Sequence, residues 1–380
     1  MTKFLHTADL HLGRAFKSIG GDVGTQLREA RFQVPEALAR LVTETGAAFV
    51  LVAGDLFDSR NPSGKVLAQA MTALGKIPAA VYAIPGNHDP GGPYGPYGSD
   101  KFRDYRERYA PNFHLLEAPE PLVLEEHGVV LLPCPATGRP GLDPTAWLRA
   151  GDAYAKLPPD VPRVAVAHGG TIDFASEVDA SPEIALHRLP RPELDYVALG
   201  DWHGAMAFHD DAYRYAGTPE ADKFPKGEHY RNGLALEVSV ARGQAPTVTE
   251  HVVGRYDWRV EMAEVRDATD VRRLDERLLA AQTQAGRLLK LELSGSLSVA
   301  DFRRLDALRE RLAEVYLHAE VDDGGLVVRP GPEELEALQH NGRDPTVARV
   351  ATALAARMDD EVEGAAARLA LVKLYEAVES

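Results

Sequence analysis

The sequence predicts an α/β fold, and three observations indicate it. Up to about Leu199, short runs rich in Val, Ile and Leu alternate with segments of helical spacing. That alternation is typical of strands covered by helices. Polar side chains that suit a ligand site follow directly after the runs. The chain has 380 residues, more than one ordinary core holds, so we expect two domains and an appendage.

Six apolar runs mark the expected strands of the first domain. Between the second and third runs, the apolar residues of segment 66–74 are spaced as one face of a helix. The Gly- and Pro-rich segment 90–98 predicts a loop without regular structure, either a lid over a site or a plain connector. Further strand-like pieces extend to Val240 and over Thr247–Val253. The six runs are Phe4–Leu5, Phe49–Val52, Val81–Ile84, Val129–Leu132, Val164–Ala167 and Tyr196–Leu199.

From Trp258 onward the pattern changes to strand, helix, strand, helix, strand, which predicts a second, smaller domain. Its strands are expected at Trp258–Val260 and Leu288–Leu293, and a last strand-like piece ends at Leu326–Val328. A helix is expected at Val299–Glu314, because Ser298 with Asp301 three residues later matches a capping box. We place the domains at residues 1–257 and 258–329, with a tail at 330–380 that begins with the linker Pro330-Gly331-Pro332.

The tail predicts two amphipathic helices. The first begins at Asp344-Pro345, a helix-start signal. Two alternatives remain open for these helices, which either pack on the parent domain or dock on a partner. The apolar stripes are Val347, Val350, Ala351, Leu354 and Met358 in the first helix, and Leu371, Leu374, Tyr375 and Val378 in the second.

Composition excludes several classes of protein. The chain has 42 Lys and Arg residues against 57 Asp and Glu residues, a formal net charge of −15. This composition excludes a broad basic surface as the means by which the protein attracts its ligands. The single cysteine, Cys134, excludes a disulfide framework and fits a reducing cytoplasm. The first residues lack the apolar core of a signal peptide. The apolar runs are too short to cross a membrane, so we expect a cytoplasmic protein.

Five short motifs carry the chemistry-bearing residues. Because the carboxyl ends of strands are where α/β sheets bind ligands, their place after successive runs predicts one common site. Residues two apart in an extended chain project to the same side, so Asp9 with His11, and Asp201 with His203, are expected to aim at one point. The motifs are Asp9-Leu10-His11, Gly54-Asp55, Gly86-Asn87-His88-Asp89, His168-Gly169-Gly170 and Gly200-Asp201-Trp202-His203.

In this order the motifs resemble those of the calcineurin-like metallophosphoesterases, over roughly residues 1–204. Within that superfamily, three segments are similar to the nuclease subunit of the double-strand-break repair complex, SbcD-like in bacteria. They are residues 6–13, residues 54–58 and Tyr215-Ala216-Gly217-Thr218-Pro219-Glu220. The resemblance implies a four-layer α/β/β/α sandwich, a small α+β capping domain and C-terminal helices.

The resemblance also implies two divalent ions bridged by Asp55. One ion takes Asp9, His11 and His203, and the other takes Asn87, His168 and Asp201. The family usually has a histidine at the position of Asp201, so either this carboxylate keeps the second ion or that ion has been lost. The oxygen and nitrogen donors suit Mn²⁺ or Fe²⁺.

Two residues of the third motif have no expected metal contact. In the family His88 lies beside the leaving oxygen and helps to protonate it. Asp89 either holds the ring of His88 or caps a turn. Phosphate contacts are expected from basic residues near the motifs, namely Arg14, Lys17, Arg60 and Lys223, together with Lys226 and Arg231.

The activity expected from this resemblance is that of a Mn²⁺-dependent DNA exonuclease and endonuclease of DNA repair and recombination. It would hydrolyse phosphodiesters by a two-metal mechanism with a bridging hydroxide. Because the chain is acidic, we expect a partner to help it bind DNA ends. The resemblance implies that this partner is an SMC-like coiled-coil ATPase held by the tail helices, and it also implies a homodimer. The alternatives are a nucleotide phosphodiesterase or phosphomonoesterase, and a non-catalytic scaffold for the ATPase.

Overall fold

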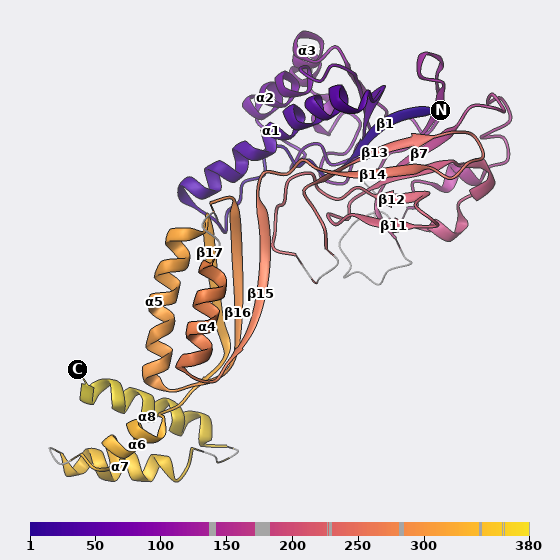
Figure 1. Cartoon of the computed structure of the whole chain (residues 1–380). Helices are drawn as coiled ribbons and strands as arrows, with labels where there is room; N and C mark the ends of the chain where they lie inside the picture. Colours follow the sequence, from indigo (N-terminus) through magenta and orange to yellow (C-terminus); the bar gives the residue numbers. More distant parts are fainter. Residues whose placement is uncertain are drawn as a thin grey trace. The chain divides into compact units, whose positions relative to one another are not determined.

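The computed structural model in Figure 1 divides into two compact units, Met1–Tyr256 and Asp257–Ser380. We refer to them as unit 1 and unit 2 and describe each by itself. The division of unit 2 into a capping domain and a tail stays a prediction. The structure describes residues 1–136, 142–171, 183–225, 227, 230–280, 285–341, 344–358, 360 and 362–379.

The first sheet of unit 1 has six strands, and helices cover its outer face. Its four strands β1 to β4 run parallel, and β13 is antiparallel to both β1 and β14. Figure 1 shows α1, α2 and α3 gathered on one side, where their apolar residues form one core with the sheet. The strand order is β14 (Thr247–Val252), β13 (Leu234–Val240), β1 (Thr2–Thr7), β2 (Phe49–Val52), β3 (Ala80–Ala83) and β4 (Phe113–Leu115); the helices are α1 (Gly21–Thr45), α2 (Gly64–Leu74) and α3 (Asp100–Tyr109).

The second sheet also has six strands, of which β12, β10, β7 and β6 are parallel to one another. Short 3₁₀ turns and the segments beside them contribute Leu148, Leu186, Leu189 and Leu194 to the core on its outer face. The order is β11 (Met206–Phe208), β12 (Tyr213–Tyr215), β10 (Tyr196–Gly200), β7 (Arg163–His168), β6 (Val129–Cys134) and β5 (Leu122–Leu124); the turns are η3 (Ala146–Arg149), η4 (Leu186–Arg188) and η5 (Arg191–Glu193), and β8 (Gly170–Thr171) pairs with β9 (Glu183–Ile184).

A second apolar core lies between the two sheets. Phe4 and Phe49 stack with ring centroids 5.0 Å apart, and Tyr196 from the other sheet meets Phe4 edge-on at 5.9 Å. The predicted mixed α/β fold is therefore confirmed, with all six predicted runs lying in or overlapping strands. In the described residues, however, the fourth layer of the sandwich consists of 3₁₀ turns rather than α-helices.

The Gly- and Pro-rich segment differs from its prediction as a loop without regular structure. Pro96–Gly98 forms the 3₁₀ turn η1, and the ring of Tyr97 is buried while Tyr94 is exposed. The Tyr97 hydroxyl donates to Asp89 Oδ2 at 2.5 Å. This hydrogen bond fixes a turn that the composition alone did not indicate.

Unit 2 begins with three parallel strands and two helices. The helices share one core with the sheet, around Leu289, Leu291 and Leu305, and Figure 1 shows them side by side against the strands. Ser298 accepts the Asp301 N–H at 3.0 Å, as the predicted cap requires. The elements are β15 (Asp257–Val265), α4 (Ala268–Leu279), β16 (Arg287–Leu297), α5 (Val299–Val315) and β17 (His318–Val328), with β16 in the centre.

Three helices end the chain, α6 (Pro332–Gln339), α7 (Pro345–Ala355) and α8 (Gly364–Glu379). They form a small core around Leu338, Ala351 and Leu371, which Val347, Leu354 and Met358 also contact. The stripe expected to grip a partner is therefore largely covered by neighbouring helices, and Val350 is its exposed member. No helix in the described part of the chain is long and apolar enough to cross a membrane.

Candidate metal centre

The predicted motif residues lie at or just beyond the carboxyl ends of strands from both sheets. Asp9 and His11 follow β1, Asp55 follows β2, and His168 is the last residue of β7. Asp201 follows β10, and its N–H donates to both carboxylate oxygens of Asp9, at 3.0 and 3.2 Å. This bond joins the ends of the two sheets, so the convergence predicted from the motif order is present.

The local backbone at the site is not the extended chain from which that convergence was argued. Asp9, His11, Asp55 and Asp201 have φ values of 56°, 44°, 51° and 98°, in a region that side chains other than glycine seldom adopt. Asp201 and His203 consequently turn to different partners rather than to one point. Strain of this kind persists only where surrounding contacts hold it, as at a functional site.

Two glycines leave room for ligand side chains. A Cβ atom on Gly86 would lie 2.0 Å from Asp55 Oδ1, and one on Gly54 would lie 2.2 Å from the Nδ1 atom of His168. Gly54 also has a φ of 91°. Any side chain at either position would displace a carboxylate or an imidazole, so these glycines are required by the packing of the site.

The first group of donors is Asp9, His11 and His203. Its ligand atoms all lie within 4.8 Å of one another. The Nε2 atoms of the two histidines face each other at 3.2 Å. Asp9 and His11 are fully buried, so water does not separate their charges and dipoles.

The second group surrounds His168. Its Nε2 lies 2.9 Å from Asn87 Oδ1, 3.4 Å from Asp55 Oδ2 and 3.7 Å from Asp201 Oδ1. The same Asp55 oxygen lies 3.5 Å from His11 Nε2. One carboxylate oxygen thus stands between a histidine of each group.

Burial and mutual charge shift the pKa values of these groups. Burial raises the pKa of Asp9 to about 6, although His203 and His168 oppose it, and burial lowers the pKa of His11 to about 4. Burial alone would raise the pKa of Asp55, but His168 outweighs it and holds that pKa low. Burial likewise opposes charge on His168, yet Asp55 and Asp9 raise its pKa well above the ordinary value.

The residues present fit divalent metal ions. Asp9, Asp55 and His168 form a second buried trio whose ligand atoms lie within 4.8 Å of one another. Buried carboxylates need a cation or a metal to offset their lost hydration, and facing imidazole nitrogens need a shared proton or cation. The mixed oxygen and nitrogen donors suit Mn²⁺ or Fe²⁺ better than a metal that prefers thiolates.

The side chains of His88 and Asp89 have different partners, which decides between the two roles left open for Asp89. His88 is exposed, and its Nδ1 lies 3.2 Å from the backbone oxygen of Asp58. Asp89 is fully buried and accepts from the Phe57 and Gly86 N–H groups at 3.0 and 2.8 Å, and from Tyr97. Asp89 therefore fastens the turn, and the contact at the ring of His88 comes from a main-chain carbonyl.

Two carboxylates beside the histidines had not been singled out in the sequence. Asp222 Oδ2 lies 2.9 Å from His203 Nδ1, and Asp58 Oδ1 lies 3.3 Å from His11 Nδ1. Burial opposes the charge of Asp222, but His203 and then Arg31 outweigh it and hold its pKa low. Asp58 lies within the segment 54–58 that resembles the repair nucleases, and Asp222 lies just after the segment 215–220. Neither residue has a sequence spacing that indicates which histidine it contacts.

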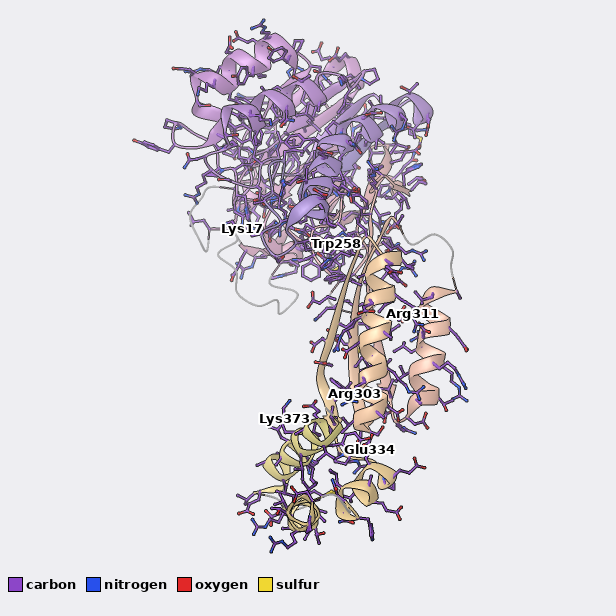
Figure 2. All side chains as sticks on the ribbon, turned by 90° about the vertical axis from the view of Figure 1, so that its left-hand side faces the viewer. Lys17, Trp258, Arg303, Arg311, Glu334 and Lys373 are labelled. Carbon is purple, nitrogen blue, oxygen red and sulfur yellow. The ribbon has the colours of Figure 1, made fainter. Side chains whose placement is uncertain are left out.

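The basic residues expected to contact phosphates fall into two classes. Arg14 pairs with Asp58 and Asp222, at 3.2 and 3.3 Å, and Arg231 donates to Glu250. Lys17, Arg60 and Lys223 are exposed, and Lys223 Nζ lies 5.9 Å from the ring centroid of Tyr230. Figure 2 labels Lys17 on unit 1. Lys226 lies outside the described residues.

Two comparisons with known proteins found similarities to this chain. A solved structure from Thermus thermophilus, that of TT1561, is 11% identical and covers 66% of this chain and 99% of its own, with a TM-score of 0.42. The sequence profile described as Calcineurin-like phosphoesterase matches residues 2–205, more than half of the chain and all of the metal-centre residues. The protein belongs to the calcineurin-like phosphoesterase family of metal-dependent hydrolases of phosphoester bonds.

Proposed function

We propose that this hydrolase is a Mn²⁺-dependent DNA nuclease that acts in DNA repair and recombination. The observation that carries the proposal is the position of Asp55 Oδ2, 3.5 Å from His11 Nε2 and 3.4 Å from His168 Nε2. One oxygen between two donor groups suits a pair of ions that share a ligand. The similarity of residues 6–13, 54–58 and 215–220 to the repair nucleases supports DNA as the substrate.

The residues of the site would have separate roles in metal binding and in proton transfer. Asp9, His11 and His203 would hold one ion, and Asn87, His168 and Asp201 the other, with Asp55 shared. Divalent cations at such a site supply activated water near neutral pH and neutralise charge on the phosphoryl group. His88, exposed beside His11 with ring centroids 4.8 Å apart, is not needed as a ligand and would donate a proton to the leaving oxygen.

Binding of DNA would rest on few side chains of this unit. Lys17, Arg60 and Lys223 are the exposed cations that the proposal assigns to phosphates, whereas Arg14 already pairs with two carboxylates. With a net charge of −15, the chain repels a duplex beyond these points. The proposal therefore includes an SMC-like ATPase held by the tail helices, and a homodimer, as means of capturing DNA ends.

The test begins with a substrate that does not depend on DNA binding. Wild-type protein with Mn²⁺ should hydrolyse bis-p-nitrophenyl phosphate, Asp55→Ala should abolish the activity, and the exposed control Asp22→Ala should leave it unchanged. End-labelled single- and double-stranded DNA, cyclic nucleotides and phosphomonoesters are then compared, with and without a co-expressed ATPase.

Each outcome separates one function from the others. Degradation of DNA supports the nuclease. Cleavage of nucleotides or monoesters alone would replace it with a nucleotide phosphodiesterase or phosphomonoesterase. If the protein hydrolyses none of these esters, whether or not Mn²⁺ is bound, the non-catalytic scaffold is the remaining alternative.

A further inference from the structure

A chain of three charged side chains lies behind the two histidines of the first donor group. His11 and His203 direct their Nε2 atoms at each other, so their Nδ1 atoms face away from the centre. Asp58 Oδ1 lies 3.3 Å from His11 Nδ1, and Asp222 Oδ2 lies 2.9 Å from His203 Nδ1. A carboxylate at Nδ1 keeps the ring proton there and leaves the Nε2 lone pair for a ligand.

Arg14 joins the two carboxylates. Its Nη1 atom lies 3.2 Å from Asp58 Oδ1 and 3.3 Å from Asp222 Oδ2. Arg14 follows β1, Asp58 follows β2, and Asp222 lies beyond β12 of the other sheet. The guanidinium therefore ties together segments from both sheets, at the points where they support the two imidazoles.

The geometry points to Asp58, Arg14 and Asp222 as positioning residues that together set the tautomer and orientation of His11 and His203. This inference rests on the proposed metal-dependent function and identifies what prepares one half of its site. It also gives Arg14 a different task from the phosphate contact expected from the sequence.

The burial of Asp222 favours this assignment over a merely structural one. Its side chain is 0% exposed, and Arg31, which also pairs with it, lies farther away than His203 or Arg14, at 3.9 Å. Arg31 already donates to two backbone oxygens, those of Leu10 at 2.5 Å and Glu220 at 2.9 Å. The shortest of the ion-pair distances from Asp222 is thus the one to His203.

The other donor group lacks this support in the described structure. His168 Nδ1 meets the backbone oxygen of Ala53 at 2.8 Å, a neutral acceptor. A carboxylate partner fixes the tautomer and orientation of an imidazole more firmly than a neutral carbonyl does. This difference predicts two Mn²⁺ sites of unequal affinity, and only the one built on His11 and His203 depends on Asp222.

The first experiment measures Mn²⁺ binding to the full-length protein by electron paramagnetic resonance and calorimetry. Asp222→Asn should weaken one of the two sites by about 10- to 100-fold and leave the other unchanged. The matched control is Asp195→Asn, another buried carboxylate, which accepts the Arg163 and Gly243 N–H groups and should alter folding stability but neither affinity. Equal Mn²⁺ affinities in Asp222→Asn and wild type would overturn the inference and make Asp222 a counter-ion of Arg31.

The second experiment needs no metal and so separates this inference from the proposed function. In the metal-free wild type, ¹⁵N chemical shifts should show His203 protonated at Nδ1, and Asp222→Ala should abolish that preference while circular dichroism shows an intact fold. An unchanged tautomer would contradict the inference even if the enzyme proves to be a nuclease. A changed tautomer would support it even if the substrate proves not to be DNA.

Arg14 is tested by its kinetic signature. Arg14→Gln should weaken Mn²⁺ binding at the same site and lower kcat until Mn²⁺ is saturating, with KM for bis-p-nitrophenyl phosphate unchanged. A higher KM with unaltered Mn²⁺ affinity would overturn the assignment of Arg14 and return it to the phosphate contacts.

Discussion

Units 1 and 2 handle their charged residues in opposite ways. Unit 1 buries Asp9, Asp55, Arg31 and Asp222, and three of these approach the same two histidines. Among the described residues of unit 2, Glu334 is the one charged side chain that is buried. The other described acids and bases of unit 2 lie at least partly exposed. Unit 1 therefore bears most of the cost in folding stability of burying ionisable groups, and the metal centre lies in this unit.

Glu334 shows what a buried charge does when no chemistry is involved. Its carboxylate accepts the N–H groups of Val299, Ala300 and Gly331, at 3.1, 2.7 and 2.7 Å, so these three donors all belong to the backbone. Figure 2 labels Glu334 at the start of α6, below Arg303 on α5. The acids at the metal centre of unit 1, Asp9, Asp55 and Asp222, instead lie close to ionisable side chains, an arrangement that favours binding a cation rather than ending a helix.

The largest expected effect concerns an exposed residue of unit 1. His88→Gln should lower kcat for bis-p-nitrophenyl phosphate by about 10²- to 10⁴-fold, the usual contribution of a general acid. His88 forms a third trio with His11 and Asp58, but it is exposed and belongs to neither of the other two trios, so the free energy of unfolding and the Mn²⁺ affinity should not change. Steady-state kinetics at saturating Mn²⁺, urea denaturation and calorimetry measure the three quantities.

His114→Gln is the control for that substitution, since His114 is an exposed histidine on β4, and it should behave as wild type. If His88→Gln instead lost Mn²⁺ as readily as Asp55→Ala, His88 would be a ligand and its assigned role would be wrong.

The next prediction tests whether unit 2 folds independently of the chemistry. Leu291 is fully buried in the core of unit 2, so Leu291→Ala should cost about 2–5 kcal/mol of the unfolding free energy of that unit. Hydrolysis of bis-p-nitrophenyl phosphate should persist unchanged. Trp258, with Trp147 and Trp202 replaced by Phe, reports on unit 2 by fluorescence during urea denaturation.

Leu51→Ala provides the comparison in unit 1, because Leu51 is equally buried between the two sheets. That substitution should lower stability and hydrolysis together. Loss of hydrolysis in Leu291→Ala, with unit 1 still folded, would mean that the active site needs unit 2.

The same contrast explains what could be predicted from the sequence. Buried parallel strands such as Phe49–Val52 are continuous apolar runs, so the predicted bounds of this strand agree with the observed ones. In unit 2, only the end of β17 is marked in the sequence, at Leu326–Val328, whereas the strand spans His318–Val328. Its alternating burial includes exposed acidic residues, and no apolar run marks such a strand.

The clustering of the motif residues could be predicted because the motifs recur after strands, whereas the residues behind the histidines could not be predicted. Nothing near Asp222 in the sequence indicates a contact with His203, since the approach depends on how β12 and the segment after it fold back. The choice between the two roles of Asp89 could not be made from the sequence for the same reason. Its neighbour in sequence is His88, but its partners in space include Phe57 and Tyr97.

The smallest prediction concerns a buried histidine of unit 1 outside the metal centre. His6 lies in β1 with its Nδ1 atom 3.0 Å from the Tyr196 hydroxyl, and burial, with a contribution from Arg214, lowers its pKa from 6.5 to about 3. Between these values the unfolded chain binds a proton that the folded chain does not. Stability should therefore fall with decreasing pH, by up to about 1.4 kcal/mol per pH unit from this residue.

His6→Asn should remove that contribution, so the stability difference between variant and wild type shrinks as the pH falls from 7 toward 4. Urea denaturation of the metal-free protein measures it, with Trp147 and Trp202 as reporters after Trp258→Phe. Phe4→Leu, a nearby substitution that does not titrate, should lower the unfolding free energy equally at every pH. If the stability difference between His6→Asn and wild type is also constant with pH, His6 accepts a proton in the folded state. Unit 1 would then tolerate a buried charge outside its metal centre.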